Sequence, residues 1–235
     1  METLEKYIVE NRGESHSDKI TDKTNVIKTI NFNQQDLIND VIKLHIPSGQ
    51  IDCDPCFSKG VFYKNGKVKI PPFRYDIEPQ LDSVEKCDCR KLPLKDNSIN
   101  SLMYDPPFVV SVGPSLTNSK PRSNLTHKRF SSSFSIPELW KLYEDSIKEF
   151  YRILDDKGIL IVKCMDTVSG GINYFSHTYI MNKAYEIGFY PKDLFILLAK
   201  SRMSSPNHKN QKHGRKFHSY FLVFQKTKCK VNYNL

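Results

Sequence analysis

Apolar residues recur along the chain with two periods, and the longer period predicts three helices. In residues 33–45 the apolar side chains fall at helical spacing, on Leu37, Ile38, Val41, Ile42 and Leu44. Residues 135–154 repeat this pattern over a greater length, and Ser135 is suited to cap the first turn. A third helix is predicted over residues 177–189, and Gly188 is expected to stop it.

Shorter apolar runs between these segments predict β-strands. The runs lie in residues 49–56, 68–79, 84–94, 98–107, 159–165, 192–200 and 218–226. Strands that alternate with helices predict an α/β fold with a mostly parallel central sheet. The last two runs have no helical pattern between them, so we expect them to pair as an antiparallel hairpin.

The organisation of the chain follows from the same pattern. Residues 1–26 are polar and weakly periodic, which predicts a loose N-terminal extension, and residues 27–235 are expected to form a single domain. No apolar run approaches the roughly 18 residues of a membrane span, and the N-terminus lacks the core of a signal peptide. These features predict a cytoplasmic protein with no membrane partner.

The net charge of +9 favours a polyanionic partner. Two segments without any acidic residue, 111–133 and 200–216, concentrate the positive charge. The candidate phosphate contacts are Lys120, Arg122, Lys128, Arg129, Arg202, Lys209, Lys212 and Arg215. We expect both segments to flank one nucleic-acid site, at the same end of the sheet as residues 105–108. The alternative is that they are two solvated surface loops.

Four of the six cysteines form two close pairs, Cys53 with Cys56 and Cys87 with Cys89. The spacing resembles that of a four-thiolate zinc site. Each pair, however, lies beside a predicted strand end that faces a ligand. Buried reduced thiols are therefore the favoured interpretation, and no metal site is predicted.

Polar side chains mark four of the predicted strand ends. They occur in residues 54–60, at Asp76 and Glu78, at Asp88, and in the sequence Asp-Pro-Pro-Phe at 105–108. Ligands of open α/β sheets bind beyond the carboxyl ends of the strands, and an acid after the second strand suits the diol of a ribose. A single such acid is commonly a solvated turn residue, but four strand ends together predict one ligand site.

With these motifs the sequence over residues 33–226 resembles the class I S-adenosylmethionine-dependent methyltransferases. Within that class it resembles the amino-methyltransferases, which modify the exocyclic amines of bases. The pattern Asp-Pro-Phe-x-Gly-x-Gly of that family is matched at 54–60, with Ser58 in place of the first glycine. The resemblance implies a Rossmann-like fold and S-adenosyl-L-methionine as cofactor. It implies that the cofactor is bound by Asp54, Cys56, Phe57, Ser58, Gly60, Asp76 (with Glu78 as the alternative ribose acid), Asp88 and Cys89.

The same resemblance implies a catalytic tetrad of Asp105, Pro106, Pro107 and Phe108. A carboxylate and a rigid carbonyl can accept both hydrogens of a planar amine, and Phe108 can stack on a base that has left its helix. The aspartate before the two prolines resembles the adenine enzymes of the family, and this resemblance implies a site-specific DNA methyltransferase that acts on adenine N6. RNA N6-adenine, DNA N4-cytosine, a protein glutamine amide and an inactive nucleic-acid-binding module stay open as alternatives. The spacing of the motifs leaves little room for a separate recognition domain, so site recognition is expected from the two basic segments, the N-terminal extension or a partner chain.

Overall fold

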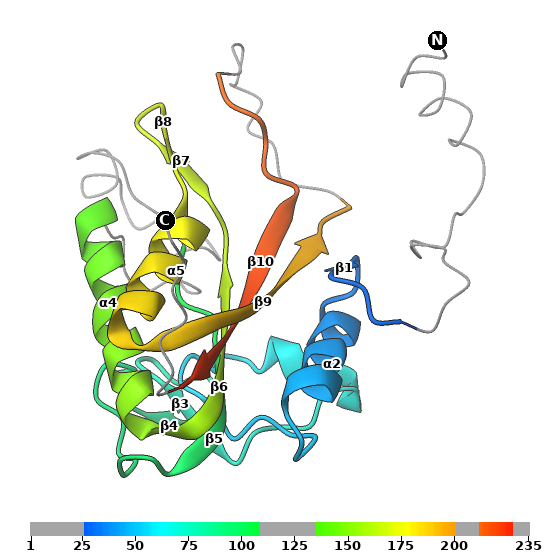
Figure 1. The fold of residues 1–235 in the computed structure, drawn as a ribbon, viewed down its shortest axis with the longest axis vertical. Coiled ribbons are helices and arrows are strands. Elements are labelled where there is room, and N and C mark those ends of the chain that lie inside the picture. The colour runs from blue at the N-terminus through cyan, green and yellow to red at the C-terminus, as the bar shows by residue number, and fades with distance from the viewer. Residues whose placement is uncertain (1–25, 109–134, 201–211, 228–235) are drawn as a thin grey trace.

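A computed structural model describes residues 26–108, 135–200 and 212–227, and these residues form a twisted sheet with helices on both faces (Figure 1). Within them the sheet has eight strands in the order β1-β9-β10-β6-β5-β2-β3-β4. The strands are β1 (Ile30–Asn31), β2 (Cys53–Asp54), β3 (Phe73–Asp76), β4 (Glu85–Lys86), β5 (Ile99–Tyr104), β6 (Leu154–Cys164), β9 (Phe189–Leu198) and β10 (His218–Lys226).

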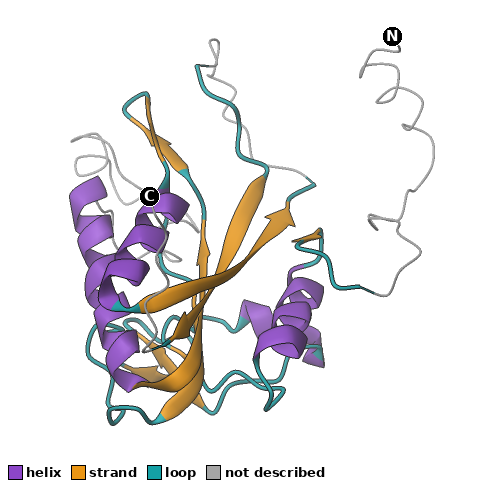
Figure 2. Ribbon diagram, in the orientation of Figure 1, coloured by secondary structure: helices purple, strands orange, loops and turns teal. Residues whose placement is uncertain are grey.

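All strand pairs of this sheet are parallel except the two that involve β10 (Figure 2). β10 runs antiparallel to both β6 and β9, which confirms the predicted final hairpin. β2 pairs with β3 on one side and with β5 on the other, so the order of connections reverses at β2 and β5. The predicted Rossmann-like α/β fold is confirmed, and its switch point lies where such sheets bind ligands.

The three predicted helices are present within a residue or two of their expected bounds. They are α2 (Gln34–His45), α4 (Ile136–Ile153) and α5 (Ser176–Ile187). The Asn33 side chain caps α2, and Ser135 forms a reciprocal capping box with Glu138 at the start of α4. Gly188 ends α5 with φ of 124°, a conformation that favours glycine.

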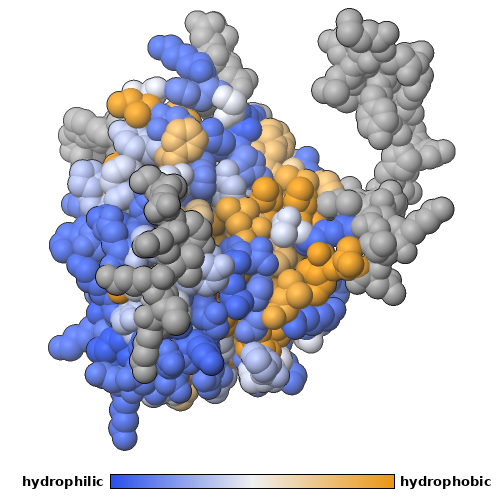
Figure 3. Space-filling view, viewed as in Figure 1, coloured by the Kyte–Doolittle hydropathy of each residue, from blue (hydrophilic) through white to orange (hydrophobic). Residues whose placement is uncertain are grey.

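Two apolar cores lie on opposite faces of the sheet. α4 and α5 pack over one face, where Leu139, Tyr143, Ile147 and Phe150 belong to the core. α2 and the short 3-10 segment η1 (Val61–Gly66) lie over the other face. In the space-filling view, apolar surface gathers around β9 and toward β1 and α2 (Figure 3). Helices thus cover both faces, as a doubly wound sheet requires.

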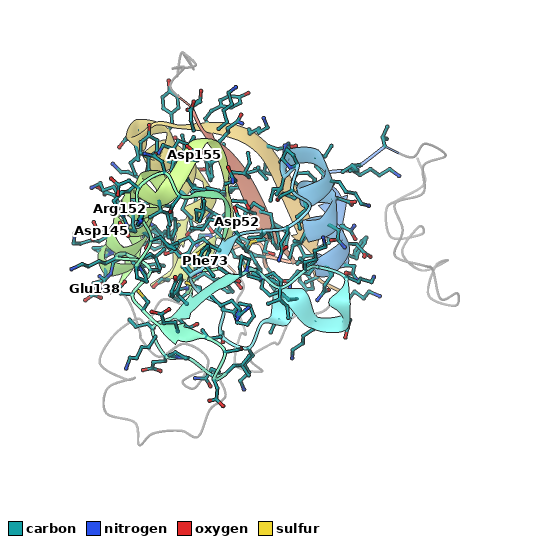
Figure 4. The ribbon with its side chains drawn as sticks, turned by 90° about the horizontal axis from the view of Figure 1, so that it is seen from below. Asp52, Phe73, Glu138, Asp145, Arg152 and Asp155 are labelled. Atoms are coloured by element: carbon teal, nitrogen blue, oxygen red, sulfur yellow. The ribbon has the colours of Figure 1, made fainter. Side chains whose placement is uncertain are left out.

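Side chains form hydrogen bonds at the end of the sheet opposite the candidate site, and two of these side chains, Asp52 and Arg152, are labelled in Figure 4. The Asp52 carboxylate accepts the backbone N–H groups of Asn100 and Ser101, at 2.7 and 3.0 Å, and so joins the start of β2 to β5. Arg152, at the end of α4, binds the Glu149 carboxylate and the carbonyl oxygens of Leu92 and Leu94. These contacts fix the connections that enter β2 and β5.

Several elements differ from the pattern-based expectation, and β9 for example begins at Phe189, three residues before the predicted run. β1, η1 and a separate hairpin of β7 (Thr167–Ser169) and β8 (Ile172–Tyr174) were not predicted, because each is too short to show a period. β6 begins at Leu154 and not at residue 159, since Leu154 pairs with Ile99 and a register shift absorbs the polar turn that follows. Lys157 in that turn has φ of 63°. The strand therefore continues through residues whose composition suggested a simple turn.

The predicted domain organisation concerns residues that the structure describes only in part. The predicted extension falls almost wholly outside the described residues, and the single domain over 27–235 stays a prediction. Within the described ranges, no helix has the length and apolarity needed to cross a bilayer.

Candidate active site

A cavity of about 570 Å³ opens at the carboxyl ends of β2, β3, β4, β5 and β6. It brings together all of the predicted cofactor and catalytic residues except Asp54 and Gly60. Its lining includes Cys56, Phe57, Ser58, Asp76, Glu78, Asp88, Cys89, Asp105, Pro106, Pro107 and Phe108. Its size is typical of sites for small ligands.

Asp54 lies behind the cavity wall and holds the first loop in place. Its carboxylate is 1% exposed; one oxygen accepts the Cys56 N–H at 2.9 Å, and the other accepts the Tyr63 hydroxyl at 2.8 Å. Burial raises the pKa of Asp54 to about 7, against the lowering effect of those hydrogen bonds. Asp54 therefore supports the loop that the family pattern assigns to the cofactor.

The loop after Asp54 follows the path of a glycine-rich turn although serine replaces one glycine. Ser58 has φ of 49° and Gly60 has φ of 62°, both in the left-handed region. A Cβ built on Gly60 would lie 2.7 Å from the Phe57 ring, which stacks on Tyr63 at a centroid distance of 5.2 Å. Gly60 is thus required by both conformation and space, whereas Ser58 tolerates the strained backbone.

Asp76 ends β3 and joins two loops at the cavity. One carboxylate oxygen accepts the Ser58 N–H and the other accepts the Glu78 N–H, each at 2.9 Å. Partial burial raises the pKa of Asp76, and the two backbone donors oppose that shift. Each oxygen keeps a second acceptor site for a hydroxyl group, while Glu78 lies at the more exposed rim.

Asp88 follows β4 on the same wall of the cavity. Its carboxylate forms a close ion pair with Arg90, with a shortest distance of 2.6 Å, and also accepts the Arg90 N–H at 2.9 Å. The hydrogen bonds from Arg90 lower the pKa of Asp88. Arg90 lines the cavity as well, so this wall presents a charge pair and not an isolated acid.

Two thiols, Cys56 and Cys89, line the cavity between these acids. A hydrogen bond between them raises the pKa of Cys56 and lowers that of Cys89. The Cys89 Sγ also lies 3.3 Å from the Ser146 Oγ of α4. Cys53 is fully buried in the core, so the expectation of reduced buried thiols fits Cys53 best. Among the described residues, no group of three or more histidine, cysteine or acidic side chains is placed to hold a metal ion.

The tetrad at 105–108 directly follows β5, and two side chains from neighbouring elements contact it. The Tyr143 hydroxyl of α4 donates to the Pro107 carbonyl at 2.9 Å. The Lys163 Nζ of β6 lies 3.4 Å from an Asp105 carboxylate oxygen and 4.9 Å from the centroid of the Phe62 ring. An aromatic face attracts an ammonium group, so Phe62 helps to hold Lys163 beside Asp105.

Sequence reasoning assigned neither Tyr143 nor Lys163 to the site. Tyr143 lies within residues 135–154, for which the sequence predicted a helix but no site residue. Lys163 carried a usable signal, because it is the one charged residue in the apolar run 159–165 and lysine is seldom buried without a partner. Its side chain is 15% exposed in the structure.

The predicted phosphate contacts are described only in part. Lys120, Arg122, Lys128, Arg129, Arg202 and Lys209 lie outside the described residues. Lys212 and Arg215 are exposed in the segment that leads into β10. Because β10 is antiparallel to β6, with Tyr220 opposite Cys164, this segment enters at the same sheet edge as the tetrad, as expected. Neither residue lines the cavity.

No family model matches the sequence, and no curated protein matches it significantly. Solved structures with a similar fold include PvuII DNA methyltransferase (cytosine-N4-specific), at 18% identity over 60% of this chain and 48% of that chain, with a TM-score of 0.44. A putative DNA modification methylase from Thermus thermophilus, complexed with S-adenosyl-L-methionine, is 15% identical over 62% of this chain and 55% of that chain, with a TM-score of 0.41. A SAM-dependent methyltransferase from Thermotoga maritima is 17% identical over 83% of this chain and 88% of that chain, with a TM-score of 0.47. The chain spans about half the length of the first two proteins.

Proposed function

We propose that this protein is an S-adenosylmethionine-dependent methyltransferase that acts on the N6 amino group of adenine in DNA. The observation that carries the proposal is the shared cavity: the tetrad at 105–108 and the acids Asp76 and Asp88 line one space. In-line transfer needs donor and acceptor held together in a fixed geometry. A cavity that combines both sets of groups supports this class of reaction.

The walls of the cavity fit the proposed cofactor. The two hydroxyl donors of its ribose suit the Asp76 carboxylate, which already bridges two loops, and Glu78 is the alternative acceptor at the rim. Asp88, next to the half-buried Cys89, is assigned to the amino group of the adenine ring of the cofactor. When bound, S-adenosylmethionine supplies an activated methyl group on a sulfonium sulfur.

The tetrad provides hydrogen-bond acceptors that can make the target amine more nucleophilic. An amino group conjugated to a base ring is a poor nucleophile, because its lone pair is delocalised. In the proposed reaction Asp105 accepts a hydrogen bond from one N–H, and the Pro106 carbonyl accepts one from the other. The Pro106 carbonyl is the acceptor that the family resemblance implies, and the hydrogen bond from Tyr143 to the neighbouring Pro107 carbonyl is consistent with that choice. Proline fixes the backbone beforehand, so little reorganisation is needed.

The remaining groups manage charge and position. Methylation of the amine would release one of its protons, and Asp105, hydrogen-bonded to that N–H, would be the first acceptor of the proton. The Lys163 ammonium, 3.4 Å from Asp105, balances the carboxylate charge. Phe108 lines the cavity and is assigned to stack on the base.

The choice of DNA and of adenine has separate support. The net charge of +9 and the two basic residues Lys212 and Arg215 at the tetrad edge favour a polyanionic substrate. The preference for adenine comes from the resemblance of the tetrad, in which an aspartate precedes the two prolines.

The test is transfer of a labelled methyl group to duplex DNA, RNA and mixed protein, followed by nucleoside analysis. We expect label on N6-methyladenine from DNA. Asp105→Ala should lower the rate by about a hundredfold to a thousandfold, while calorimetry shows cofactor affinity within threefold of the wild type. Asp145→Asn, an acid on the outer face of α4, serves as the matched control.

Each contrary result has a distinct meaning. Label on RNA, on cytosine or on protein would replace the proposed substrate while keeping the reaction class. Loss of both transfer and cofactor affinity in Asp105→Ala would mean that its role is misassigned. Cofactor binding without transfer to any substrate would favour a binding module.

A further inference from the structure

A β-hairpin of uncharged residues projects from the end of the sheet where β6 leads into β7 (Figure 1). This is the end at which the tetrad follows β5. β7 and β8 pair antiparallel, and Gly170 and Gly171 form the turn with φ of 59° and 78°. Val168 is 43% exposed and Ile172 is 58% exposed. Val168 pairs with Asn173 and Ile172 with Ser169, so the two apolar side chains lie on opposite faces of the ribbon.

The foot of this hairpin is firmly anchored. The Asp166 carboxylate, 3% exposed, accepts the backbone N–H of His177 at 3.3 Å and contacts its Nδ1 at 2.7 Å. The Tyr174 ring meets the edge of Trp140 at 6.0 Å, and Trp140 stacks on Tyr179 at 4.3 Å. The foot thus fixes the position of a tip that carries one exposed apolar side chain on each face.

Positive charge lies directly beside the tip. The His213 Nε2 lies 2.7 Å from the Gly171 carbonyl oxygen, which joins the hairpin to the segment before β10. That segment contains Lys212, Arg215 and Lys216 and no acid. Arg215 lies 5.9 Å from the ring of Phe217, which is 41% exposed. In Figure 3 apolar atoms of the hairpin end lie near hydrophilic atoms of this segment.

The hairpin also has a short covalent connection to the proposed catalytic site. Lys163, which contacts Asp105, lies on β6 only four residues before the start of β7. The chain therefore rises from the tetrad wall straight into the hairpin. The hairpin therefore begins close to the wall of the cavity that Lys163 lines.

We propose that this hairpin is a wedge that enters duplex DNA beside the target base while Lys212, Arg215 and Lys216 hold the flanking phosphates. The inference rests on the proposed function and specifies how the base reaches the cavity. An apolar side chain on each face of a two-stranded ribbon matches a space between two base pairs, where such wedges unstack DNA. Adjacent cations supply the electrostatic attraction that inserted apolar groups lack.

The experiment compares native DNA with the same DNA after heat denaturation, since strand separation removes the step that a wedge assists. Val168→Ser with Ile172→Ser should lower kcat/KM at least tenfold on native DNA and less than threefold on denatured DNA. Lys212→Gln with Arg215→Gln should weaken the binding of both native and denatured DNA and reduce the salt dependence of that binding. Leu44→Ser with Ile70→Ser, and Lys43→Gln with Lys141→Gln, are matched exposed controls on other elements.

Binding of a fluorescent 30-base-pair duplex of mixed sequence gives a second readout, independent of methyl transfer. The hairpin pair should weaken duplex binding at least fivefold, with the controls unchanged. Equal losses on native and denatured DNA, or wild-type behaviour in both readouts, would overturn the wedge. If the wild type binds cofactor but methylates no DNA, the proposed function fails, and the duplex-binding comparison still decides the role of the hairpin.

Discussion

The two halves of the sheet differ in how their backbone is held. β2, β3 and β4 have two to four residues each, whereas β5, β6, β10 and β9 have six to eleven. The longer strands are held by extended ladders and by the packing of α4 and α5. The shorter strands have few ladder bonds, yet most of the candidate cofactor residues follow them.

Carboxylates take over part of the role of the ladder in the short-stranded half. Asp52, Asp54, Asp76 and Asp88 each accept backbone N–H groups from nearby loops or from β5. A ladder of amide bonds does not titrate, but carboxylates do. The backbone of the proposed cofactor half should therefore be more sensitive to pH and to single acid substitutions than the backbone of the long-stranded half, which extended ladders hold.

The largest expected effect is the pH dependence of stability through Asp54. Its pKa is about 7 in the fold and about 4 in the unfolded chain, so between these values the folded state keeps a proton that the unfolded state has lost. The stability that this proton contributes is present below pH 4 and is lost as the pH rises toward 7. The free energy of unfolding should fall by up to about 4 kcal/mol over that range.

Asp54→Asn removes this titration, so its unfolding free energy should depend less steeply on pH between 4 and 7. Urea titrations at a series of pH values measure the slope. Asp145→Asn, on the surface of α4, should leave the slope of the wild type intact. Parallel curves for Asp54→Asn and the wild type would show that Asp54 does not couple stability to pH.

The second effect concerns cofactor affinity. Asp76→Ala removes the acceptor assigned to the ribose and frees the N–H groups of Ser58 and Glu78. Hydrogen bonds to a charged group contribute about 1.5–3 kcal/mol, so affinity for S-adenosylmethionine should fall about 10-fold to 100-fold. Calorimetry measures the change, with Glu85→Ala on the exposed strand β4 as control. Unaltered affinity would transfer the ribose role to Glu78.

A third, smaller effect tests the contact that crosses from the long-stranded half to the tetrad. Tyr143→Phe deletes the hydrogen bond to the Pro107 carbonyl, and a typical bond of this kind contributes about 0.5–1.5 kcal/mol. We expect kcat to fall about three- to tenfold while cofactor affinity stays constant. Tyr104→Phe deletes a similar buried bond, to Ser146, that does not touch the tetrad. Equal losses of kcat in both variants would indicate a purely structural role for Tyr143.

The same contrast between halves explains what the sequence could predict of the fold. The long helices and strands repeat their apolar period several times, so α4 and β10 were predicted almost to the residue. β1 and η1 depend on contacts with distant segments: Ile30 pairs with Ile196, and Phe62 packs on Phe221. A local pattern cannot reveal pairings of that kind.

The location of the candidate site residues was predicted more fully than their contacts. The strand-end acids and the tetrad were placed at one cavity by topology alone, since parallel strands bring their carboxyl ends together. The ion pair of Asp88 with Arg90, the buried position of Asp54 and the approach of Lys163 to Asp105 depend on side-chain packing. Ser58 lies between these cases, because the sequence showed the departure from glycine but not the backbone that serine would adopt.

Ser58→Gly gives the smallest expected effect, and its comparison with a β-branched variant is the finest test of the short-stranded half. Its φ of 49° costs a non-glycine residue about 1–2 kcal/mol, and glycine would relieve that strain while adding unfolded-state entropy of about 0.5–1 kcal/mol. Ser58→Gly should therefore change the unfolding free energy by less than about 1 kcal/mol. Ser58→Val, β-branched and poorly suited to positive φ, should lose about 1–3 kcal/mol. Both keep the N–H that Asp76 accepts, so identical stabilities in urea titrations would mean that the loop relaxes and that Asp76 does not hold it in the left-handed conformation.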